Sequence, residues 1–403
     1  MDIGTRETLV AWVNGAALEG IALRELLAGF CARLLDAGVP LSRGVLGVDT
    51  LHPTLEGYFF EWRPQQDEVR QVEYSRDQAA QEIDRWRQSP FHRLHETGQK
   101  SLRRRIERGE GIDEFPVIPE LRADGVTDYF CLRHRFGDRS IGDVDAVYSS
   151  WTTRMPGGFI DAHIAALEIL IPTLAVAVKA ASYGQIARNL AETYLGRDVG
   201  QRVLAGEISR GKAERIEAVV WFSDLASYTR ITDSAMPDTI IPLLNDYAEA
   251  VVDAIHAMKG EVLKFIGDGV LALFRSPSNE ESCRRALAAA LEARRHVAAV
   301  NERRTARQAP VTSIYLGLHL GEMFFGNIGS ADRLDFTAVG PAVNETSRVV
   351  AMCRSLDQEI LVSANFAANA GDAGARLISV GRYALRGVSR PQELFTLDPE
   401  IAA

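Results

Sequence analysis

The pattern of apolar and polar positions predicts an N-terminal region that mixes helices with strands. Residues 18–37 place apolar side chains three and four apart, which is typical of an amphipathic helix that ends at Gly38. Shorter apolar stretches between polar loops predict strands at residues 43–48, 57–62, 127–132 and 146–151. Two further stretches, residues 91–108 and 159–181, are predicted to be helices. We therefore expect an α+β domain over residues 1–181.

The helical pattern continues past this domain, with apolar residues such as Ile186 and Leu190, and it stops at Gly206. A chain of 403 residues is long enough for two domains. We expect residues 182–212 to be a helical linker to a second domain at residues 213–403. Two interpretations of the linker stay open: a helix that pairs with its twin in a dimer and carries a signal, or a packed connector.

Residues 129–181 combine a strand, a turn, a second strand and the sequence Gly-Gly-Phe-Ile-Asp, which leads into a long apolar helix. This order is similar to that of a GAF-type sensor domain. The resemblance implies that the N-terminal domain binds an effector, which could be a small molecule, an ion or a partner protein. This stretch carries no diagnostic ligand motif, so an unrelated α+β module is the alternative interpretation.

The first stretch with chemical character begins with the predicted strand at residues 216–222, which runs directly into Asp224. The residues Ser227, Tyr228 and Thr229 then open a helix. A carboxylate at a strand end beside a helix start suits a metal–phosphate site, because helix-terminal N–H groups bind phosphate while the carboxylate holds a divalent ion. The alternative is a plain helix cap.

The second stretch places Asp268 between two glycines and between two apolar strands, which predicts a tight hairpin. Turn chemistry alone explains Asp268. It does not explain Lys264, a lone charge in an otherwise apolar strand. Because lysine is almost never fully buried unless it is paired, we expect Lys264 to face a polar cleft.

The third stretch is a strand that ends at Gly340, followed by Pro341 at the first position of a helix. Asn344 and Arg348 are four residues apart, so they lie on one face of that helix near its start. An amide beside a guanidinium can orient a sugar and neutralise phosphate charge. A surface polar pair is the alternative.

Together these three stretches resemble the catalytic domain of class III adenylate and guanylate cyclases, over about residues 215–397. Residues 317–322, 326–330 and 385–391 extend the likeness. The resemblance implies a ferredoxin-like palm fold in the C-terminal domain, and an enzyme that converts ATP to 3′,5′-cyclic AMP and pyrophosphate. It also implies a homodimer, because in this family each active site combines residues of two protomers.

By that resemblance, Asp224 and Asp268, with the backbone carbonyl of Leu225, would hold two Mg²⁺ or Mn²⁺ ions at each site. Asn344 would orient the ribose, and Arg348 would stabilise charge that develops on the phosphates. The helix start at residues 227–229 would contact the substrate phosphates.

Lys264 and Thr337 match the positions at which the family reads the purine. Lys264 would donate to adenine N1, and Thr337 would accept from the 6-amino group. Guanylate cyclases of the family typically have Glu and Cys at these positions, so this Lys/Thr subgroup of bacterial type favours ATP. Threonine here also resembles the subgroup that bicarbonate stimulates, which makes bicarbonate a candidate effector.

One position departs from the family pattern. Many relatives have a phosphate-binding lysine where this chain has Val388. Arg386 and Arg390 are both candidates for that role, and the sequence does not distinguish them. The competing hypothesis is a catalytically degenerate cyclase homologue that binds nucleotide or a partner. The intact Asp224 and Asp268 argue against it, because degenerate domains usually lose a metal carboxylate.

The amino-acid composition narrows the classes of partner that the chain is expected to bind. The net charge of −9 argues against nucleic acid or an anionic membrane as the main partner, so the run of three arginines at residues 103–105 is predicted to be a solvated helix face. The four cysteines show no metal-binding spacing and are expected to be reduced and buried. The N-terminus resembles no signal peptide, and residues 164–181 are too short and interrupted for a membrane span. We expect a soluble, cytoplasmic protein.

Overall fold

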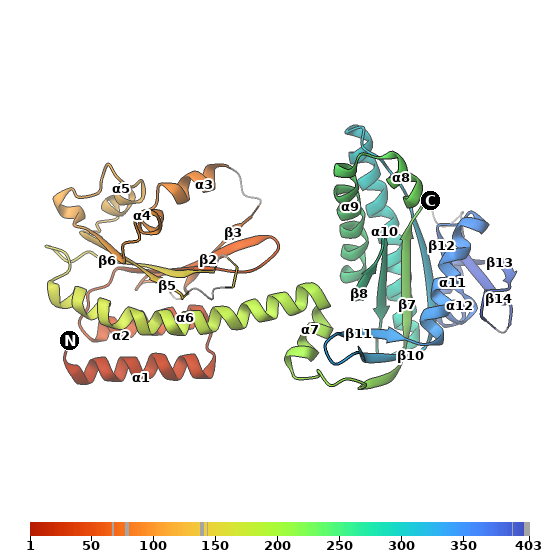
Figure 1. Ribbon diagram of the computed structural model, residues 1–403, viewed down its shortest axis with the longest axis horizontal. Coiled ribbons are helices and arrows are strands. Elements are labelled where there is room, and N and C mark those ends of the chain that lie inside the picture. The colour runs from red at the N-terminus through yellow and green to blue at the C-terminus, as the bar shows by residue number, and fades with distance from the viewer. Residues whose placement is uncertain (67, 77–79, 138–140, 143, 389, 399–403) are drawn as a thin grey trace. The chain divides into compact units, whose positions relative to one another are not determined.

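The structure is a computed structural model that describes residues 1–66, 68–76, 80–137, 141–142, 144–388 and 390–398. The chain divides into two compact units, Met1–Leu190 and Ala191–Ala403 (Figure 1). Each unit combines its own sheet with packed helices, which confirms the predicted mixed α+β class.

The N-terminal unit is built on a six-stranded antiparallel sheet in the order β3-β2-β1-β6-β5-β4. Its strands are β1 (Arg43–Asp49), β2 (Leu55–Trp62), β3 (Arg70–Ser75), β4 (Ser101–Arg104), β5 (Asp128–Arg135) and β6 (Ala146–Thr153). The four strands predicted from the sequence correspond to β1, β2, β5 and β6. All eight positions of β6 are buried, because helices cover both faces of the sheet.

The helices of this unit form two layers (Figure 1). On one face α1 (Ile3–Glu19), α2 (Leu23–Asp36) and α6 (Asp161–Leu195) pack around the buried side chains of Phe30 and Trp151. On the other face α3 (Ala80–Arg87), α4 (Pro90–Thr97) and α5 (Val117–Ala123) surround a smaller apolar cluster.

Two of the predicted helices are wrong in extent. The stretch 18–37 is broken at Gly20, whose left-handed φ of +70° ends α1 before α2 begins. The stretch 91–108 is a short helix, then β4 and the 3₁₀ turn η1 (Ile106–Arg108), because Gly98 at φ +68° ends α4. Arg103 therefore lies on a strand, where it pairs with the fully buried Asp128 at 2.6 Å.

Helix α6 is 35 residues long, and ten of its side chains are buried in the N-terminal unit. Within the described part of the chain, it is the one helix long and apolar enough to cross a membrane by length and composition. Its outward side includes the apolar residues Ile169 and Val176, which are about half exposed or more. Helix α7 (Arg197–Leu204) follows it directly.

The C-terminal unit has an eight-stranded sheet in the order β13-β14-β12-β10-β7-β9-β8, with β11 paired to β10. The strands are β7 (Ala213–Leu225), β8 (Glu261–Ile266), β9 (Gly269–Phe274), β10 (Ile314–Gly329), β11 (Leu334–Val339), β12 (Ile360–Ser363), β13 (Leu377–Tyr383) and β14 (Gln392–Leu397). The helices are α8 (Tyr228–Ser234), α9 (Pro237–Ala257), α10 (Asn279–Ala306), α11 (Pro341–Leu356) and α12 (Ala364–Asn369), with the 3₁₀ turn η2 (Gly371–Arg376).

The centre of this unit is the β7-α9-β8-β9-α10-β10 succession, whose strands lie in the order β10-β7-β9-β8. This is the ferredoxin-like arrangement that the sequence predicted. Helices α9 and α10 pack on one face around Trp221 and Phe274, both without exposed surface. Helices α7 and α11 pack on the opposite face.

Candidate active site

Asp224 lies at the end of β7, the long central strand of the C-terminal unit. It is opposite Tyr315 of β10, while its neighbour Ser223 is opposite Val270 of β9. The buried residues Val219, Val220 and Trp221 hold the strand in the core, so the position of the carboxylate at the strand end is well defined.

Asp268 occupies the tight turn between β8 and β9, as the sequence predicted. Gly267 has φ +63°, a conformation that favours glycine. At Gly269 a Cβ atom would lie only 2.4 Å from the carbonyl oxygen of Ser223, so only glycine lets β9 approach β7 this closely. The turn is thereby held against the end of β7, and the backbone N–H of Leu225 donates a hydrogen bond of 3.1 Å to Asp268 Oδ2.

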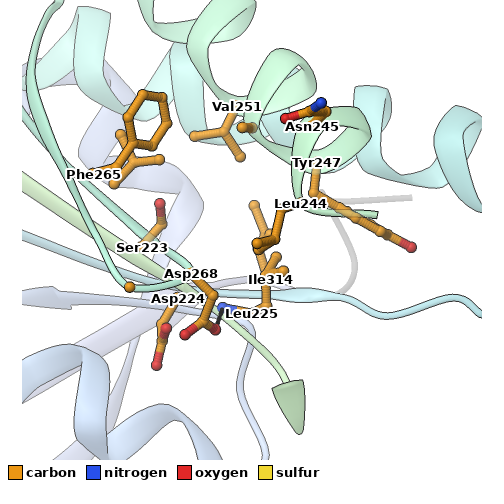
Figure 2. Close-up of a pocket in the computed structure, with 13 residues that line it drawn as sticks. Ser223, Asp224, Leu225, Leu244, Asn245, Tyr247, Val251, Phe265, Asp268 and Ile314 are labelled. Carbon is orange, nitrogen blue, oxygen red and sulfur yellow. Dashed lines mark hydrogen bonds between the residues drawn. The ribbon is translucent and has the colours of Figure 1, made fainter. Parts of the chain in front are cut away.

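A cavity of about 200 Å³ opens beside these two carboxylates (Figure 2). Besides Asp224 and Asp268, its walls include Phe265 from β8 and Leu244, Asn245 and Tyr247 from α9. Figure 2 shows the Asp268 carboxylate next to the Leu225 backbone, with Asp224 beside it. Sequence reasoning did not identify the α9 residues, because nothing in the spacing of that helix distinguishes cavity-lining side chains from surface ones.

Electrostatics at this pair favour a bound cation. Burial, followed by the hydrogen bond and the negative charge of Asp268, raises the pKa of Asp224 to about 6. The positive charge of Arg354, in the last turn of α11, acts in the opposite direction. Two partly buried carboxylates that repel each other lower their energy when a divalent ion lies between them.

The available donors suit a hard divalent ion, because Asp224, Asp268 and the Leu225 carbonyl all offer oxygen. The described residues contain no group of three or more His, Cys, Asp and Glu side chains that could hold a metal. Mg²⁺ keeps several ligands from water and substrate phosphate, so two carboxylates are sufficient on the protein side.

The residues predicted to contact phosphate lie just beyond this pair. Ser227 has the left-handed φ of +56° and precedes the first residue of α8, Tyr228. Tyr228 packs partly against the core, whereas Thr229 is exposed. The start of α8 thus follows Asp224 closely along the chain.

Lys264 lies elsewhere, on the edge strand β8. Its ammonium group forms an ion pair with Asp335 of β11. The two residues line a second cavity of about 520 Å³, together with Tyr194, Leu195 and residues 332–334. The expectation that Lys264 faces a polar cleft agrees with this arrangement.

The other predicted site residues are not among those that line the cavity at Asp224. Thr337 is buried on β11, two residues after Asp335 and on the same side of the strand. Asn344 and Arg348 are exposed on the first half of α11. The structure therefore brings Asp224, Asp268 and Leu225 together within the chain, and it holds Lys264, Asn344 and Arg348 apart from them.

Val388 packs against the apolar cluster that includes Val349, Cys353 and Leu385. The position at which the family resemblance implies a phosphate-binding lysine thus contributes to packing in this chain. Arg386 and Arg390 are both exposed, while Ser389 lies outside the described residues. The positive charge of Arg354 lowers the pKa of Asp224, and sequence reasoning missed this residue because it looks like an ordinary basic residue in a last helical turn.

His319 on β10 is a hydrogen-bonded core histidine. It is buried, and its Nδ1 lies 2.8 Å from the Ser363 hydroxyl. Burial lowers the pKa of His319 to about 4, so the ring is neutral at physiological pH.

Comparison with known proteins adds to this geometry. Residues 212–398 match the family model of the adenylate and guanylate cyclase catalytic domain. An uncharacterised protein of Mycobacterium tuberculosis is 32% identical over 210 residues, which cover 51% of this chain and 37% of that protein. Adenylate cyclase 1 of Rhizobium meliloti is 28% identical over 179 residues, which cover 43% of this chain and 26% of the relative. The chain thus spans well under half the length of these relatives.

Among solved structures, the adenylyl cyclase CyaB from Pseudomonas aeruginosa is similar with a TM-score of 0.43 and 24% identity, covering 46% of this chain and 96% of that one. The family match and the predicted motifs fall on the same part of the chain. The C-terminal unit therefore contains a class III adenylate/guanylate cyclase catalytic domain.

Proposed function

We propose that this chain, through the cyclase catalytic domain at residues 212–398, is an adenylate cyclase that converts ATP to 3′,5′-cyclic AMP and pyrophosphate. The observation that carries the proposal is the adjacent pair Asp224 and Asp268 at the mouth of a cavity of about 200 Å³. A degenerate homologue has no need to keep two mutually repelling carboxylates there. Their arrangement supports turnover over nucleotide binding alone.

In the proposed reaction the ribose 3′-hydroxyl loses its proton to solvent water, and its oxygen forms a bond to the α-phosphorus. The bond between that phosphorus and the bridging oxygen breaks, and pyrophosphate leaves. Asp224, Asp268 and the Leu225 carbonyl would hold Mg²⁺ or Mn²⁺. When bound, these ions would favour ionisation of the hydroxyl and neutralise the triphosphate.

The chain's own residues would orient the rest of the substrate. Asn344 would accept or donate a hydrogen bond to the ribose, and Arg348 would stabilise charge on the phosphates as the bond breaks. Residues 227–229 would present backbone N–H groups and hydroxyls to the triphosphate. Lys264 would donate to adenine N1 and Thr337 would accept from the 6-amino group, which favours ATP over GTP. The similarity to adenylate cyclase 1 of Rhizobium meliloti supports the same choice.

We propose further that the two halves of each site come from two protomers of a homodimer. Arg354 acts on Asp224 within one protomer, and helix α11 extends from it toward Arg348 and Asn344. At 1.5 Å per residue, Arg348 lies about 9 Å and Asn344 about 15 Å farther along the helix axis. Both side chains are exposed, so a second protomer can bring them to the carboxylates of the first. Twofold symmetry gives two such sites.

Regulation by the N-terminal half is also part of the proposal. Residues 1–181 would form a GAF-like sensor, and residues 182–212 would connect it to the catalytic domain. The continuity of α6 supports this role, because the helix supplies ten buried residues to the N-terminal unit and then leads into α7. A small molecule or bicarbonate is the proposed class of effector.

Product analysis of the full chain with ATP or GTP, in Mg²⁺ or Mn²⁺, tests the central proposal. We expect cyclic AMP from ATP, little product from GTP, and none from Asp224→Ala. Asp372→Ala, an exposed carboxylate in η2, is the matched control and should keep full activity. A dimeric protein that binds ATP but forms no cyclic product with either metal would support the degenerate alternative instead.

A further inference from the structure

The ion pair between Lys264 and Asp335 joins two strands that share no hydrogen-bonded ladder. Lys264 is on β8 at one edge of the sheet, whereas β11 is paired to β10. The side chains are 28% and 58% exposed, so the pair contributes little to the stability of the fold. Its consequence is positional: it fixes the end of a long side chain that would otherwise rotate freely.

The cavity around this pair has the character of a subsite for a flat, polar ring. Its volume of about 520 Å³ is typical of small-molecule sites. Tyr194 and Leu195 contribute apolar surface, and Tyr194 is 78% exposed, so its ring is free to lie against a ligand. Lys264 and Asp335 contribute a donor and an acceptor side by side.

We propose that Asp335 is a positioning residue for purine selection, an inference that rests on the proposed function. An ammonium group donates and a carboxylate only accepts. A lysine without a partner can follow either adenine N1 or guanine O6, because both are acceptors. A lysine that Asp335 restrains can reach only one of these two acceptors, which in the proposed function is adenine N1. Asp335 therefore makes Lys264 selective, and it reduces the side-chain ordering that nucleotide binding requires.

Thr337 does not supply this restraint in the structure. It lies two residues farther along β11 and is buried, and Lys264 pairs with Asp335. The two β11 residues would thus have separate roles, because Asp335 holds the lysine while Thr337 accepts from the base.

Asp335→Asn in the full chain tests the proposal, with Asp372→Asn as the matched control. Asp372 is exposed in η2 and is not among the residues that line either cavity. We expect Asp335→Asn to raise KM for ATP about fivefold to tenfold, with kcat changed by less than about twofold. The ratio of kcat/KM for ATP to that for GTP should fall about tenfold. Asp372→Asn should change neither quantity.

A double-mutant cycle separates positioning from a general structural effect. In a Lys264→Ala background, Asp335→Asn should have no further effect on the ATP-to-GTP ratio, because the residue that it positions is gone. Additive effects of the two substitutions, or an Asp335→Asn variant that behaves like Asp372→Asn, would overturn the proposal.

Nucleotide binding keeps this test independent of turnover. If the wild-type chain forms no cyclic product, competition of ATP and GTP against a fluorescent ATP analogue gives the Kd of each nucleotide, and the preference for ATP is then the Kd for GTP divided by the Kd for ATP. A lower preference for ATP in Asp335→Asn would support the proposal even though the enzymatic assignment had failed. An unchanged ratio, or a wild-type chain that binds neither nucleotide, would overturn it.

Discussion

The backbone N–H of Leu225 donates a 3.1 Å hydrogen bond to the carboxylate of Asp268, and this contact joins the end of β7 to the β8–β9 turn. The turn needs Gly267 for its positive φ and Gly269 for its closeness to Ser223. Two carboxylates that are 44 positions apart in the sequence are therefore held side by side by the fold. The cost of that arrangement is the raised pKa of Asp224.

Asp268→Asn should abolish activity without destabilising the metal-free protein. The folded pKa of Asp224, about 6, lies above its ordinary value of 3.8, so ionisation of Asp224 lowers the stability of the fold as pH rises from about 4 to 6. An asparagine at position 268 keeps an oxygen that can accept the hydrogen bond from the Leu225 N–H. It also removes the charge repulsion with Asp224. We expect a loss of at least about 100-fold in kcat. In thermal unfolding at pH 7.5 with chelator, Tm should be equal or higher. A Tm lowered by several degrees would contradict this account.

Mixing two inactive variants should restore activity if the sites are shared between protomers. Asp224→Ala removes one half of each site and Arg348→Ala the other half. In a heterodimer, one of the two sites then receives both wild-type halves. Random exchange makes half of the dimers mixed, so we expect about a quarter of wild-type activity after co-refolding or co-expression. Homodimers of each single variant provide the control, and they should be inactive because both of their sites lack one wild-type half. No recovery in confirmed heterodimers would place each site within one chain.

Replacement of both purine-reading residues should change the substrate. Lys264→Glu with Thr337→Cys offers an acceptor to guanine N1–H and the 2-amino group in place of a donor to adenine N1. We expect kcat/KM for ATP to fall at least about tenfold, while that for GTP rises, as measured by product analysis with each nucleotide. Lys212→Glu, a charge reversal at the exposed residue before β7, is the control for net charge and should keep the preference for ATP. A double variant that still prefers ATP would remove these two residues from base selection.

Through Glu261, the stability of the fold should depend on pH independently of the active site. Burial, with the nearby charge of Asp198, raises the pKa of Glu261 to about 7, and its Oε1 is buried without a hydrogen-bond partner. Because the folded pKa lies above the ordinary 4.5, the fold loses stability as pH rises from about 4.5 through 7. Glu261→Gln should raise the Tm of the C-terminal unit by a few degrees at pH 8 and change it little at pH 5. Equal effects at both pH values would contradict the assigned pKa.

Elements with strong local patterns were predictable from the sequence. The apolar strands around Gly-Asp-Gly and the Pro341 helix start were identified correctly, because turn and cap preferences act over a few residues. The break at Gly20 and the strand at residues 101–104 were missed. In both places a glycine in the left-handed conformation ends a helix whose apolar spacing continues beyond it.

Contacts between distant segments were not predictable from spacing. The sequence identified Lys264 as an unusual charge. Its partner Asp335, however, is on β11, which is not adjacent in the sheet to β8, the strand of Lys264. Arg354 likewise acts on Asp224 only because α11 crosses the sheet beside β7. Side chains brought together by tertiary packing leave no periodic signal in the sequence.

The four cysteines were expected to be buried, and Cys31, Cys131, Cys283 and Cys353 indeed have no exposed surface. Burial raises the pKa of the last three to about 12, and it also raises the pKa of Cys31 well above its ordinary value. Maleimides and similar reagents react with the thiolate. In the folded chain they should therefore label the four native cysteines very little. A single cysteine introduced at exposed Val176 would be the one reactive thiol, and a fluorescent or spin label could be attached there without first removing any native cysteine.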